Sequence, residues 1–251
     1  MGSLLKRALS HLGGMAILFV QTLLCTATPP YEFRAWSAQM HYLGVKSLSI
    51  TNITALFTGM VLALQTSYSL AAYGAKYFVA DVVSLALVRE LGPVLTALMV
   101  GGRVGAGITA EIGSMKVTDQ LDAMRALAAN PVKKLVVPKV VATVVMLPLL
   151  TILADFIGIL GGMAMAVFQL NQTSGFYLQH VIAAVQIQDV LSGLGKAVFF
   201  GLFISLIACY NGLNARGGAD GVGRATTSTV VAASITILIS DFFLTKLFMS
   251  F

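Results

Sequence analysis

Long blocks of apolar residues, separated by short polar connections, dominate the chain. Five apolar runs cover roughly residues 47–66, 79–101, 140–168, 190–212 and 228–250. A helix needs about 20 apolar residues to cross the hydrocarbon core of a bilayer, and each run reaches that length. The runs are continuous, whereas the strands of a membrane barrel alternate apolar and polar positions. The pattern therefore predicts an all-α fold, a polytopic membrane helical bundle with about five transmembrane helices.

A shorter apolar stretch, residues 12–28, comes before the first run and follows Lys6 and Arg7. A basic start, an apolar middle and small residues near the end also occur in cleaved signal peptides. We favour a retained helix that lies in the membrane interface. Residues 1–46 then form an N-terminal cytoplasmic or interfacial segment, and residues 47–251 form the membrane-spanning domain.

The composition excludes a soluble domain. Only 10% of the residues are charged and 57% are hydrophobic, whereas about a quarter of a typical soluble domain is charged. The net charge of +6 indicates basic loops rather than nucleic-acid binding. Twelve of the 16 lysines and arginines fall before the first run, between the second and third runs, or between the fourth and fifth. Because such loops stay in the cytoplasm, we expect a cytoplasmic N-terminus and an outer C-terminus.

The connection between the second and third runs contains a candidate short helix. We expect it over about residues 118–129, because Thr118 or Asp119 can cap its start and Asn130-Pro131 stops it. Three apolar residues fall on one face of this helix: Leu121, Met124 and Leu127. The helix either rests on the membrane surface or docks into a groove on a cytoplasmic partner. Acidic residues on its exposed side argue against contact with anionic lipid, so docking is favoured.

The sequence contains neither a nucleotide-binding motif nor a catalytic arrangement. The glycine-rich segment 217–227 lacks the Gly-Lys-Ser/Thr of a phosphate-binding loop, and we expect a tight turn there. The three histidines are scattered outside the apolar runs, with His180 expected in a polar loop, and the two cysteines have no metal-binding spacing. We therefore expect no enzyme activity and no cofactor in this chain. Any ATP must be bound by another subunit.

Five charged residues lie well inside the apolar runs. They are Arg89 and Glu90 in the second run, Asp155 in the third, Lys196 in the fourth and Asp241 in the fifth. Each costs about 2.5–3.5 kcal/mol at the centre of a bilayer on insertion scales, so each should face protein or a wet cavity. Two hypotheses remain open. The charges pair with one another and hold the bundle together, or they line a polar cavity for a charged headgroup or an ion.

The neighbouring pair Arg89 and Glu90 marks the middle of the second run. Successive residues on an α-helix point about 100° apart, so we expect the two side chains not to serve the same narrow surface. Pro93 follows one turn later. Because proline has no N–H, it leaves a backbone carbonyl available to another donor.

Several of these segments together resemble a known family. The segment LVRELGPVLTAL begins at Leu87, and GRVGAGITAEIGSMKVTDQLDA begins at Gly102. Asn130-Pro131, the LVVPK that begins at Leu135, the CYNG that begins at Cys209 and the segment 217–227 fit the same pattern. Over roughly residues 45–250 the chain is similar to the MlaE permease family, whereas the first 45 residues carry no comparable motif.

This resemblance implies the permease subunit of an ABC transporter that moves phospholipids between the inner and outer membranes of a bacterium and maintains outer-membrane lipid asymmetry. In that family two permease copies form a homodimer with the lipid cavity between them. Two cytoplasmic ABC ATPase subunits bind ATP and Mg, and a periplasmic MCE-domain protein binds the lipid. The resemblance places this chain in the inner (cytoplasmic) membrane, with its N-terminus in the cytoplasm and its C-terminus in the periplasm.

The resemblance also assigns roles to particular residues. Arg89, Glu90 and Lys196 correspond to the charged residues of the lipid cavity. The residues implied in ATPase coupling are Glu111, Thr118, Asp119, Leu121, Asp122, Met124, Arg125 and Leu127.

Two other functions remain compatible with the sequence. In an ion-coupled secondary transporter, the carboxylates of Glu90, Asp155 and Asp241 would bind the coupling ion. The two halves of the chain show no convincing repeat, which argues against that class. An assembly scaffold would need all the intramembrane charges to be purely structural.

Overall fold

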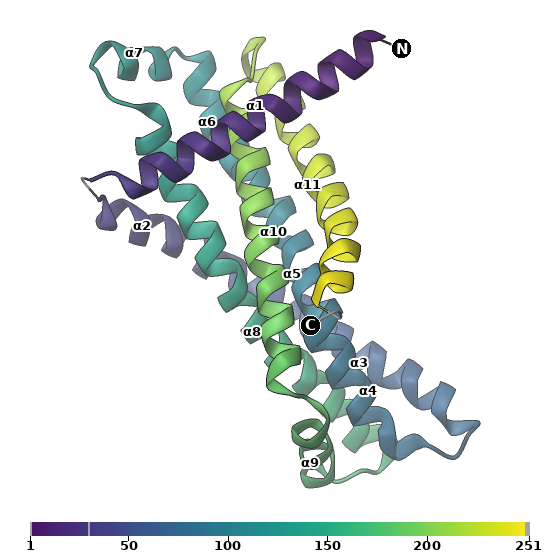
Figure 1. The fold of residues 1–251 in the computed structure, drawn as a ribbon. Helices are drawn as coiled ribbons and strands as arrows, with labels where there is room; N and C mark the ends of the chain where they lie inside the picture. Colours follow the sequence, from purple (N-terminus) through teal and green to yellow (C-terminus); the bar gives the residue numbers. More distant parts are fainter. Residues whose placement is uncertain (1, 30, 249–251) are drawn as a thin grey trace. The chain divides into compact units, whose positions relative to one another are not determined.

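The computed structural model describes residues 2–29 and 31–248, and the described residues contain helices but no strand (Figure 1). Five helical stretches are long and apolar enough to cross a membrane: Phe33–Ala71, Lys76–Val117, Val132–Leu170, Ile187–Leu213 and Gly218–Phe248. This arrangement confirms the all-α polytopic fold. Each helical stretch contains most or all of one apolar run.

The helices have the following bounds. The α-helices are α1 (Gly2–Ala27), α2 (Phe33–Leu43), α3 (Leu48–Ala71), α4 (Val79–Ala86), α5 (Gly92–Val100), α6 (Ala106–Val117), α7 (Gln120–Ala126), α8 (Val137–Leu170), α9 (Ser174–Ala184), α10 (Ile187–Leu213) and α11 (Gly218–Phe248). Short 3-10 turns form η1 (Val45–Ser47) and η2 (Lys76–Phe78). Three π-helical turns interrupt the spans: η3 (Leu87–Leu91), η4 (Gly101–Gly105) and η5 (Val132–Val136).

The chain forms two compact units, each assembled from three separate segments. The first unit comprises residues 1–45, 101–146 and 201–236, and the second comprises residues 46–100, 147–200 and 237–251. The long helices α8, α10 and α11 each contribute residues to both units.

In the first unit, the N-terminal segment is attached to the start of the third span. The apolar stretch 12–28 is helical as expected, as part of α1, and α1 packs against η5. Lys133 Nζ donates a hydrogen bond to the carbonyl of Pro29 at 2.9 Å, and Lys134 forms an ion pair with Glu32. The N-terminal segment therefore contacts the first residues of the third span, directly after the connection that contains α7.

A buried hydroxyl joins three helices in the core of the first unit. Thr109 Oγ1 on α6 lies 3.0 Å from the carbonyl of Ala208 on α10 and 2.9 Å from Thr229 Oγ1 on α11. Asn211 Nδ2 donates to the same Thr229 oxygen at 2.9 Å. Hydrogen bonds of this kind help hold membrane helices together where the hydrophobic effect does not act between them.

In the second unit, glycines allow α3 and α8 to approach closely. A Cβ added at Gly59 would overlap the carbonyl oxygen of Gly158, and one added at Gly161 would overlap that of Leu56. Small residues at helix crossings are typical of membrane bundles, because packing replaces the hydrophobic effect there. The close crossing of α3 and α8 therefore requires residues without a side chain at positions 59 and 161.

The second unit also contains a helix that lies between spans. Tyr177 on α9 is buried against Ala80 of α4 and Ala166 of α8. His180 lies on α9 rather than in a loop, and its Nδ1 is 2.9 Å from the carboxylate of Asp81. The expectation of a polar loop residue was wrong, because the apolar face of this segment folds it into a helix.

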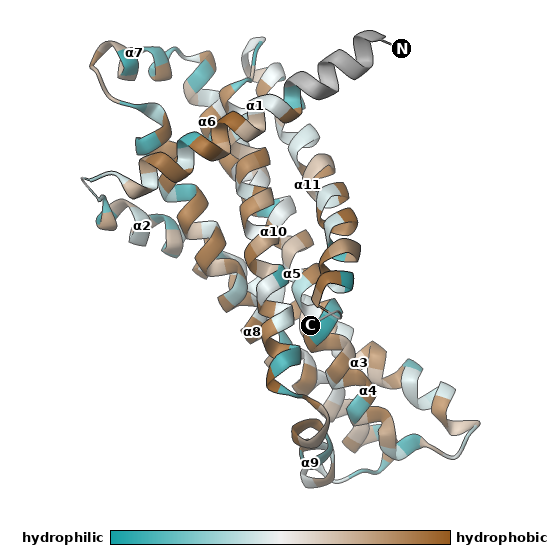
Figure 2. Ribbon diagram, viewed as in Figure 1, coloured by the Kyte–Doolittle hydropathy of each residue, from teal (hydrophilic) through white to brown (hydrophobic). Residues whose placement is uncertain are grey.

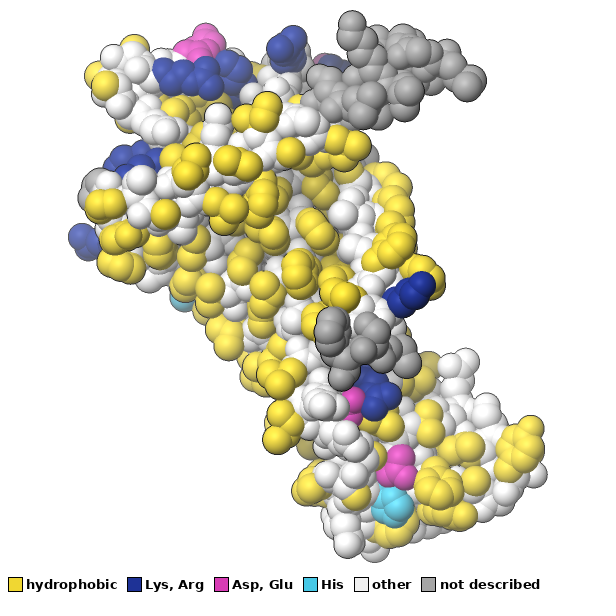
Figure 3. Space-filling model, in the orientation of Figure 1, with side chains coloured by type: hydrophobic (Ala, Val, Ile, Leu, Met, Phe, Trp, Pro, Cys, Tyr) yellow, Lys and Arg dark blue, Asp and Glu magenta, His cyan; other side chains and the backbone are white. Residues whose placement is uncertain are grey.

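The surfaces of the long helices are apolar where a membrane would contact them. Many large hydrophobic side chains are exposed, among them Phe57 on α3, Phe156 on α8 and Phe242 on α11. Hydrophobic residues, drawn brown in Figure 2, make up much of α8, α10 and α11. Hydrophobic side chains, drawn yellow in Figure 3, cover much of the visible surface. An exposed apolar surface of this extent fits contact with lipid chains rather than with water.

We expect Gly59→Ala to lower the free energy of unfolding by about 1–3 kcal/mol, because overpacking at a close contact forces the backbones apart. Gly107→Ala is the matched control, since nothing lies within 4 Å of its Cβ position. The measurement is unfolding of the purified protein in detergent. Equal stability of the two variants would contradict a tight crossing at Gly59.

Candidate functional site

The second unit contains a partly open polar cavity of about 460 Å³, a volume within the usual range of ligand pockets. Eight residues line it: Arg89, Glu90, Gln188, Asp189, Ser192, Lys196, Thr245 and Phe248. They come from η3, α10 and α11. The structure therefore brings the three candidate lipid-binding residues, Arg89, Glu90 and Lys196, together at one site, which we call the polar cavity.

A π-helical turn explains how Arg89 and Glu90 share this cavity. The turn η3 is closed by a hydrogen bond from the N–H of Gly92 to the carbonyl of Leu87, five residues earlier. A π-turn holds more residues than an α-turn, so neighbouring side chains point in more similar directions. The expectation that Arg89 and Glu90 cannot serve the same surface was wrong, because it assumed regular α-helical geometry.

Pro93 has no N–H to donate to a carbonyl of the preceding turn, and a side chain of α10 supplies a donor instead. Lys196 Nζ donates to the carbonyl of Arg89 at 3.0 Å, which confirms the expected free carbonyl. The backbone of Gly193 lies so close to the carbonyl of Val88 that a Cβ at Gly193 would overlap the oxygen. The irregular turn is thus fixed against α10 on this side.

Lys196 is the centre of an intramembrane charge network. Its Nζ lies 2.6 Å from Glu90 Oε2, 2.6 Å from Thr245 Oγ1 and 3.4 Å from Asp241 Oδ1. An ammonium group has three donors, and the carbonyl of Arg89, Glu90 and Thr245 satisfy all three. The Lys196 side chain is only 2% exposed, so it has no surface left for a ligand.

Arg89 has a different position in the network. Its Nε donates to Asp189 Oδ1 at 2.7 Å, while the other oxygen of Asp189 accepts the backbone N–H of Gln186 at 2.9 Å. The Arg89 side chain is 48% exposed, and its terminal guanidinium nitrogens have no hydrogen-bond partner among the described residues. A guanidinium offers five donors and binds phosphate in a bidentate manner. Arg89 can therefore contact an anionic group in the polar cavity.

Glu90 is also accessible. Its side chain is 39% exposed although one oxygen is paired with Lys196, and Thr245 Oγ1 lies 3.1 Å from the other oxygen. The polar cavity thus presents a cationic and an anionic group side by side. No group of three or more histidine, cysteine or acidic side chains in the described part of the chain has metal-binding geometry. The paired cation and anion suit binding of a polar ligand.

Sequence reasoning missed five of the eight lining residues. Asp189 lies one residue before the expected fourth run, so it was counted with the loop. Thr245 lies one helical turn after Asp241, a spacing that puts both on one face of α11. That spacing was the available signal for Thr245, whereas Gln188, Ser192 and Phe248 have no distinctive pattern.

The connection between the second and third spans folds into a shorter helix than expected. The helix α7 covers Gln120–Ala126, instead of residues 118–129. Asp119 and Ala128 adopt positive φ angles of 57° and 59°, which end the helix on both sides. Asp119 occupies the N-cap position without a side-chain capping bond, while the hydroxyl of Thr118 bonds back to Ser114 at the end of α6. The expected side-chain cap was therefore wrong.

The apolar residues of this connection do not share one environment. Leu121 is fully buried within the protein, Met124 is half-buried, and Leu127 is 82% exposed. The expectation that these three residues form one exposed docking ridge is therefore wrong for Leu121, because this side chain packs inside the first unit and is not accessible to a partner. Leu127 is the apolar side chain that remains accessible to a partner.

Charged residues attach α7 to α6. Asp122 accepts hydrogen bonds from Lys116 and from Arg125, both at 3.0 Å. The hydrogen bond and the positive charge of Lys116 lower the pKa of Asp122 below its usual value, so this carboxylate is ionised at neutral pH. Lys and Arg side chains gather around α7 beside an acidic one in Figure 3. Glu111, further back on α6, pairs at 2.6 Å with the buried ammonium of Lys139.

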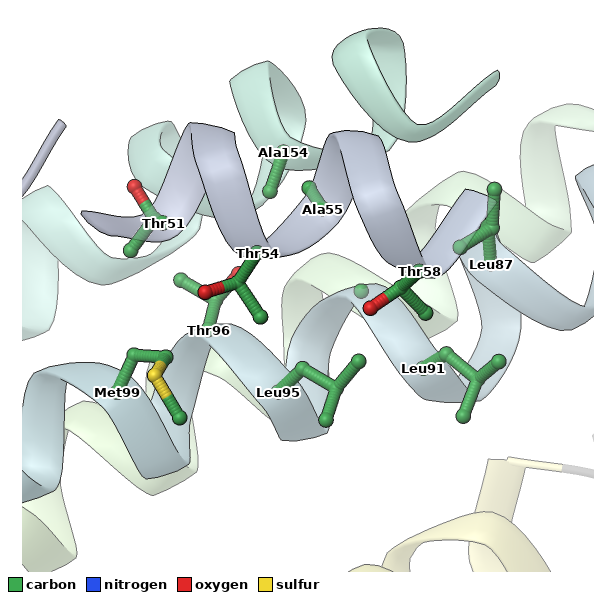
Figure 4. A pocket seen from close by; sticks show the side chains of 11 residues that line it. Thr51, Thr54, Ala55, Thr58, Leu87, Leu91, Leu95, Thr96, Met99 and Ala154 are labelled. Atoms are coloured by element: carbon green, nitrogen blue, oxygen red, sulfur yellow. The ribbon is translucent and has the colours of Figure 1, made fainter. Parts of the chain in front are cut away.

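The second unit, which contains the polar cavity, also has a much smaller apolar cavity. Four threonines and several leucines surround it (Figure 4): Thr51, Thr54, Thr58, Thr96, Leu87, Leu91 and Leu95. The hydroxyls of Thr51 and Thr54 bond back to carbonyls of their own helix, so methyl groups form the wall. Its volume of about 10 Å³ is at the lower limit for one water molecule. It is therefore not a candidate ligand site.

Comparison with known proteins gives a consistent result. The family model described as Permease MlaE matches residues 36–247. A probable ABC transporter permease protein of Rickettsia bellii is 44% identical over 242 residues, covering 96% of this chain and 93% of the relative. The intermembrane phospholipid transport system permease protein MlaE of Haemophilus influenzae is 42% identical over 210 residues, covering 83% and 80%.

We expect Lys196→Met to lower the free energy of unfolding by about 3–5 kcal/mol, because it removes a fully buried cation and leaves Glu90, Asp241 and the carbonyl of Arg89 without their shared partner. Arg89→Gln should cost less, about 1 kcal/mol, because Arg89 is half-exposed and the glutamine amide keeps a donor for Asp189. Unfolding of the purified protein in detergent measures both. Equal losses in the two variants would show that Lys196 is not the structural centre of the network.

Proposed function

This chain belongs to the MlaE permease family, and from that premise we propose that it is the membrane-spanning subunit of an ABC transporter that moves phospholipids between the inner and outer membranes. The polar cavity carries this proposal. It provides an accessible cation and an accessible anion within helices whose remaining surface is apolar. A phospholipid has the matching division into a charged headgroup and apolar chains.

The two accessible side chains suit the two ends of a phospholipid headgroup. The terminal guanidinium nitrogens of Arg89 can donate to the phosphate in a bidentate manner. The carboxylate of Glu90, held by Lys196, can accept hydrogen bonds from headgroup hydroxyl or ammonium groups. The lipid chains would lie against exposed apolar side chains, in a space completed by a second copy of the permease.

The energy for transport would come from separate subunits. The sequence has no nucleotide-binding motif, which supports ATP and Mg being bound by a cytoplasmic ABC ATPase. We infer that α7 and the exposed Leu127 form the contact with that ATPase. An MCE-domain protein would receive or deliver the lipid on the periplasmic side of the bacterial inner membrane.

One helical stretch connects the two proposed sites. The stretch Lys76–Val117 contains Arg89 and Glu90, and α7 follows directly after it. ATP binding that moves α7 would therefore act on the element that presents both headgroup contacts. Transport requires that the ATP-linked states bind lipid with different affinities, because a ligand bound equally in both states shifts nothing.

The pairing of the carboxylates supports an ATPase-driven permease over an ion-coupled transporter. Glu90 and Asp241 both lie within 4 Å of the ammonium of Lys196. A coupling cation at these carboxylates would have to displace or repel that ammonium. The two intramembrane acids near the polar cavity thus already share a cation that belongs to the chain.

We expect Arg89→Gln to lower phospholipid transfer by about tenfold or more, because a hydrogen bond to a charged group contributes about 1.5–3 kcal/mol. The assay uses proteoliposomes that contain the permease with its ATPase and MCE-domain partners. Arg34→Gln is the control, since it removes the same charge from an exposed position on α2. Unchanged transfer by an intact Arg89→Gln complex would refute headgroup binding at Arg89.

We expect Leu127→Asp to weaken ATPase binding by about tenfold or more, because burying a leucine contributes about 1.5–3 kcal/mol. Copurification of the ATPase at graded concentrations measures this loss. Leu121→Asp should instead lower the thermal stability of the permease, because Leu121 is buried within the chain. Full ATPase binding by Leu127→Asp would rule out Leu127 as the contact.

A further inference from the structure

One intramembrane acid stands apart from the charge network. Asp155 lies on α8 in the second unit, and it does not line the polar cavity. Its Oδ1 is fully buried and has no hydrogen-bond partner among the described residues. A buried polar atom without a partner is costly, so its presence requires an explanation.

The oxygen of Asp155 is in contact with the end of the π-helical turn. A Cβ added at Gly92 would overlap Asp155 Oδ1, and the carbonyl oxygen of Leu87 lies 2.9 Å from the same Cβ position. Two oxygens therefore converge on one side of Gly92. An ionised carboxylate would face a carbonyl dipole of the same sign there, whereas a protonated carboxyl group can donate to the carbonyl.

Among the described residues, no Lys, Arg or His side chain forms an ion pair with Asp155. On η3, Arg89 pairs with Asp189 of α10, and Glu90 pairs with Lys196. Lys196 also faces Asp241 of α11. The other packed elements add no free charge: α3 contains no Lys, Arg, Asp, Glu or His, and Asp81 of α4 pairs with His180 of α9. An ionised Asp155 would thus stand alone at the centre of a span.

We propose that Asp155 is a proton-binding positioning residue, whose neutral carboxyl group donates to the carbonyl of Leu87 and so fixes the turn η3. Leu87 O already accepts the N–H of Gly92, and a carbonyl has a second lone pair for this additional donor. The turn is then held from α8 by Asp155 and from α10 by Lys196. The proton thereby helps to set the directions of Arg89 and Glu90.

Infrared spectroscopy of the purified permease tests the proton directly. At about pH 7 the protein should show the carbonyl-stretch band of a protonated carboxyl group, and Asp155→Asn should remove it. Asp189→Asn is the matched control and should leave the band, because Asp189 is paired with Arg89. A spectrum in which Asp155→Asn retains the whole band would overturn the proposal.

Transport by the complex with its ATPase and MCE-domain partners tests the positioning role. Asp155→Asn keeps a donor and should retain at least about half of the wild-type rate of phospholipid transfer. Asp155→Leu has similar volume but no donor and should be slower by about fivefold, the effect of one typical hydrogen bond. Equal rates for the two variants would overturn the positioning role.

Only this second test rests on the proposed function. If the wild-type complex transfers no phospholipid, the proposed function fails, whereas the infrared band still decides whether Asp155 carries a proton. If Asp155→Leu does not fold, the comparison of wild type with Asp155→Asn remains decisive. A rate for Asp155→Asn below about a fifth of wild type would then contradict rescue by a neutral donor.

Discussion

The hydrocarbon core of a bilayer supplies no water to polar groups, and this constraint shapes the second unit. A charge in a span must find its partners within the protein. Lys196 does so with Glu90, Thr245 and a carbonyl that Pro93 leaves free. The irregular turn η3 is thus stabilised by the same ammonium that neutralises the acid beside it. Removing the lysine would leave the carbonyl of Arg89, Glu90 and Thr245 without this donor.

The same constraint explains why irregular backbone occurs where the function is proposed. π-helical turns are rare and are frequent at functional sites. In η3 the turn brings Arg89 and Glu90 to one cavity, which an ideal α-helix would not do. Glycine at positions 92 and 193 lets α8 and α10 approach this turn, because a side chain at either position would overlap an oxygen. Packing and site geometry are therefore inseparable here.

Features that depend on composition over many residues were predictable from the sequence. The five spans follow from continuous apolar runs, and the cost of charges in a membrane marks the five intramembrane charged residues. The family resemblance then selects Arg89, Glu90 and Lys196 among them. Features that depend on single backbone angles or tertiary contacts were not. The length of α7 is set by positive φ angles at Asp119 and Ala128, which no residue type there predicts. The burial of Leu121 likewise depends on its packing against the rest of the protein.

Structural pairing and the proposed ligand binding, which the sequence presented as alternatives, can belong to different members of one network. A charge that is fully buried and fully hydrogen-bonded can stabilise the fold but has no free surface, and Lys196 fits this description. Arg89 and Glu90 have partners that fix their direction, and each keeps a remaining surface that faces the cavity. Preorganised contacts of this kind lower the entropic cost of binding. The pairing is therefore what makes the accessible charges suitable for a ligand.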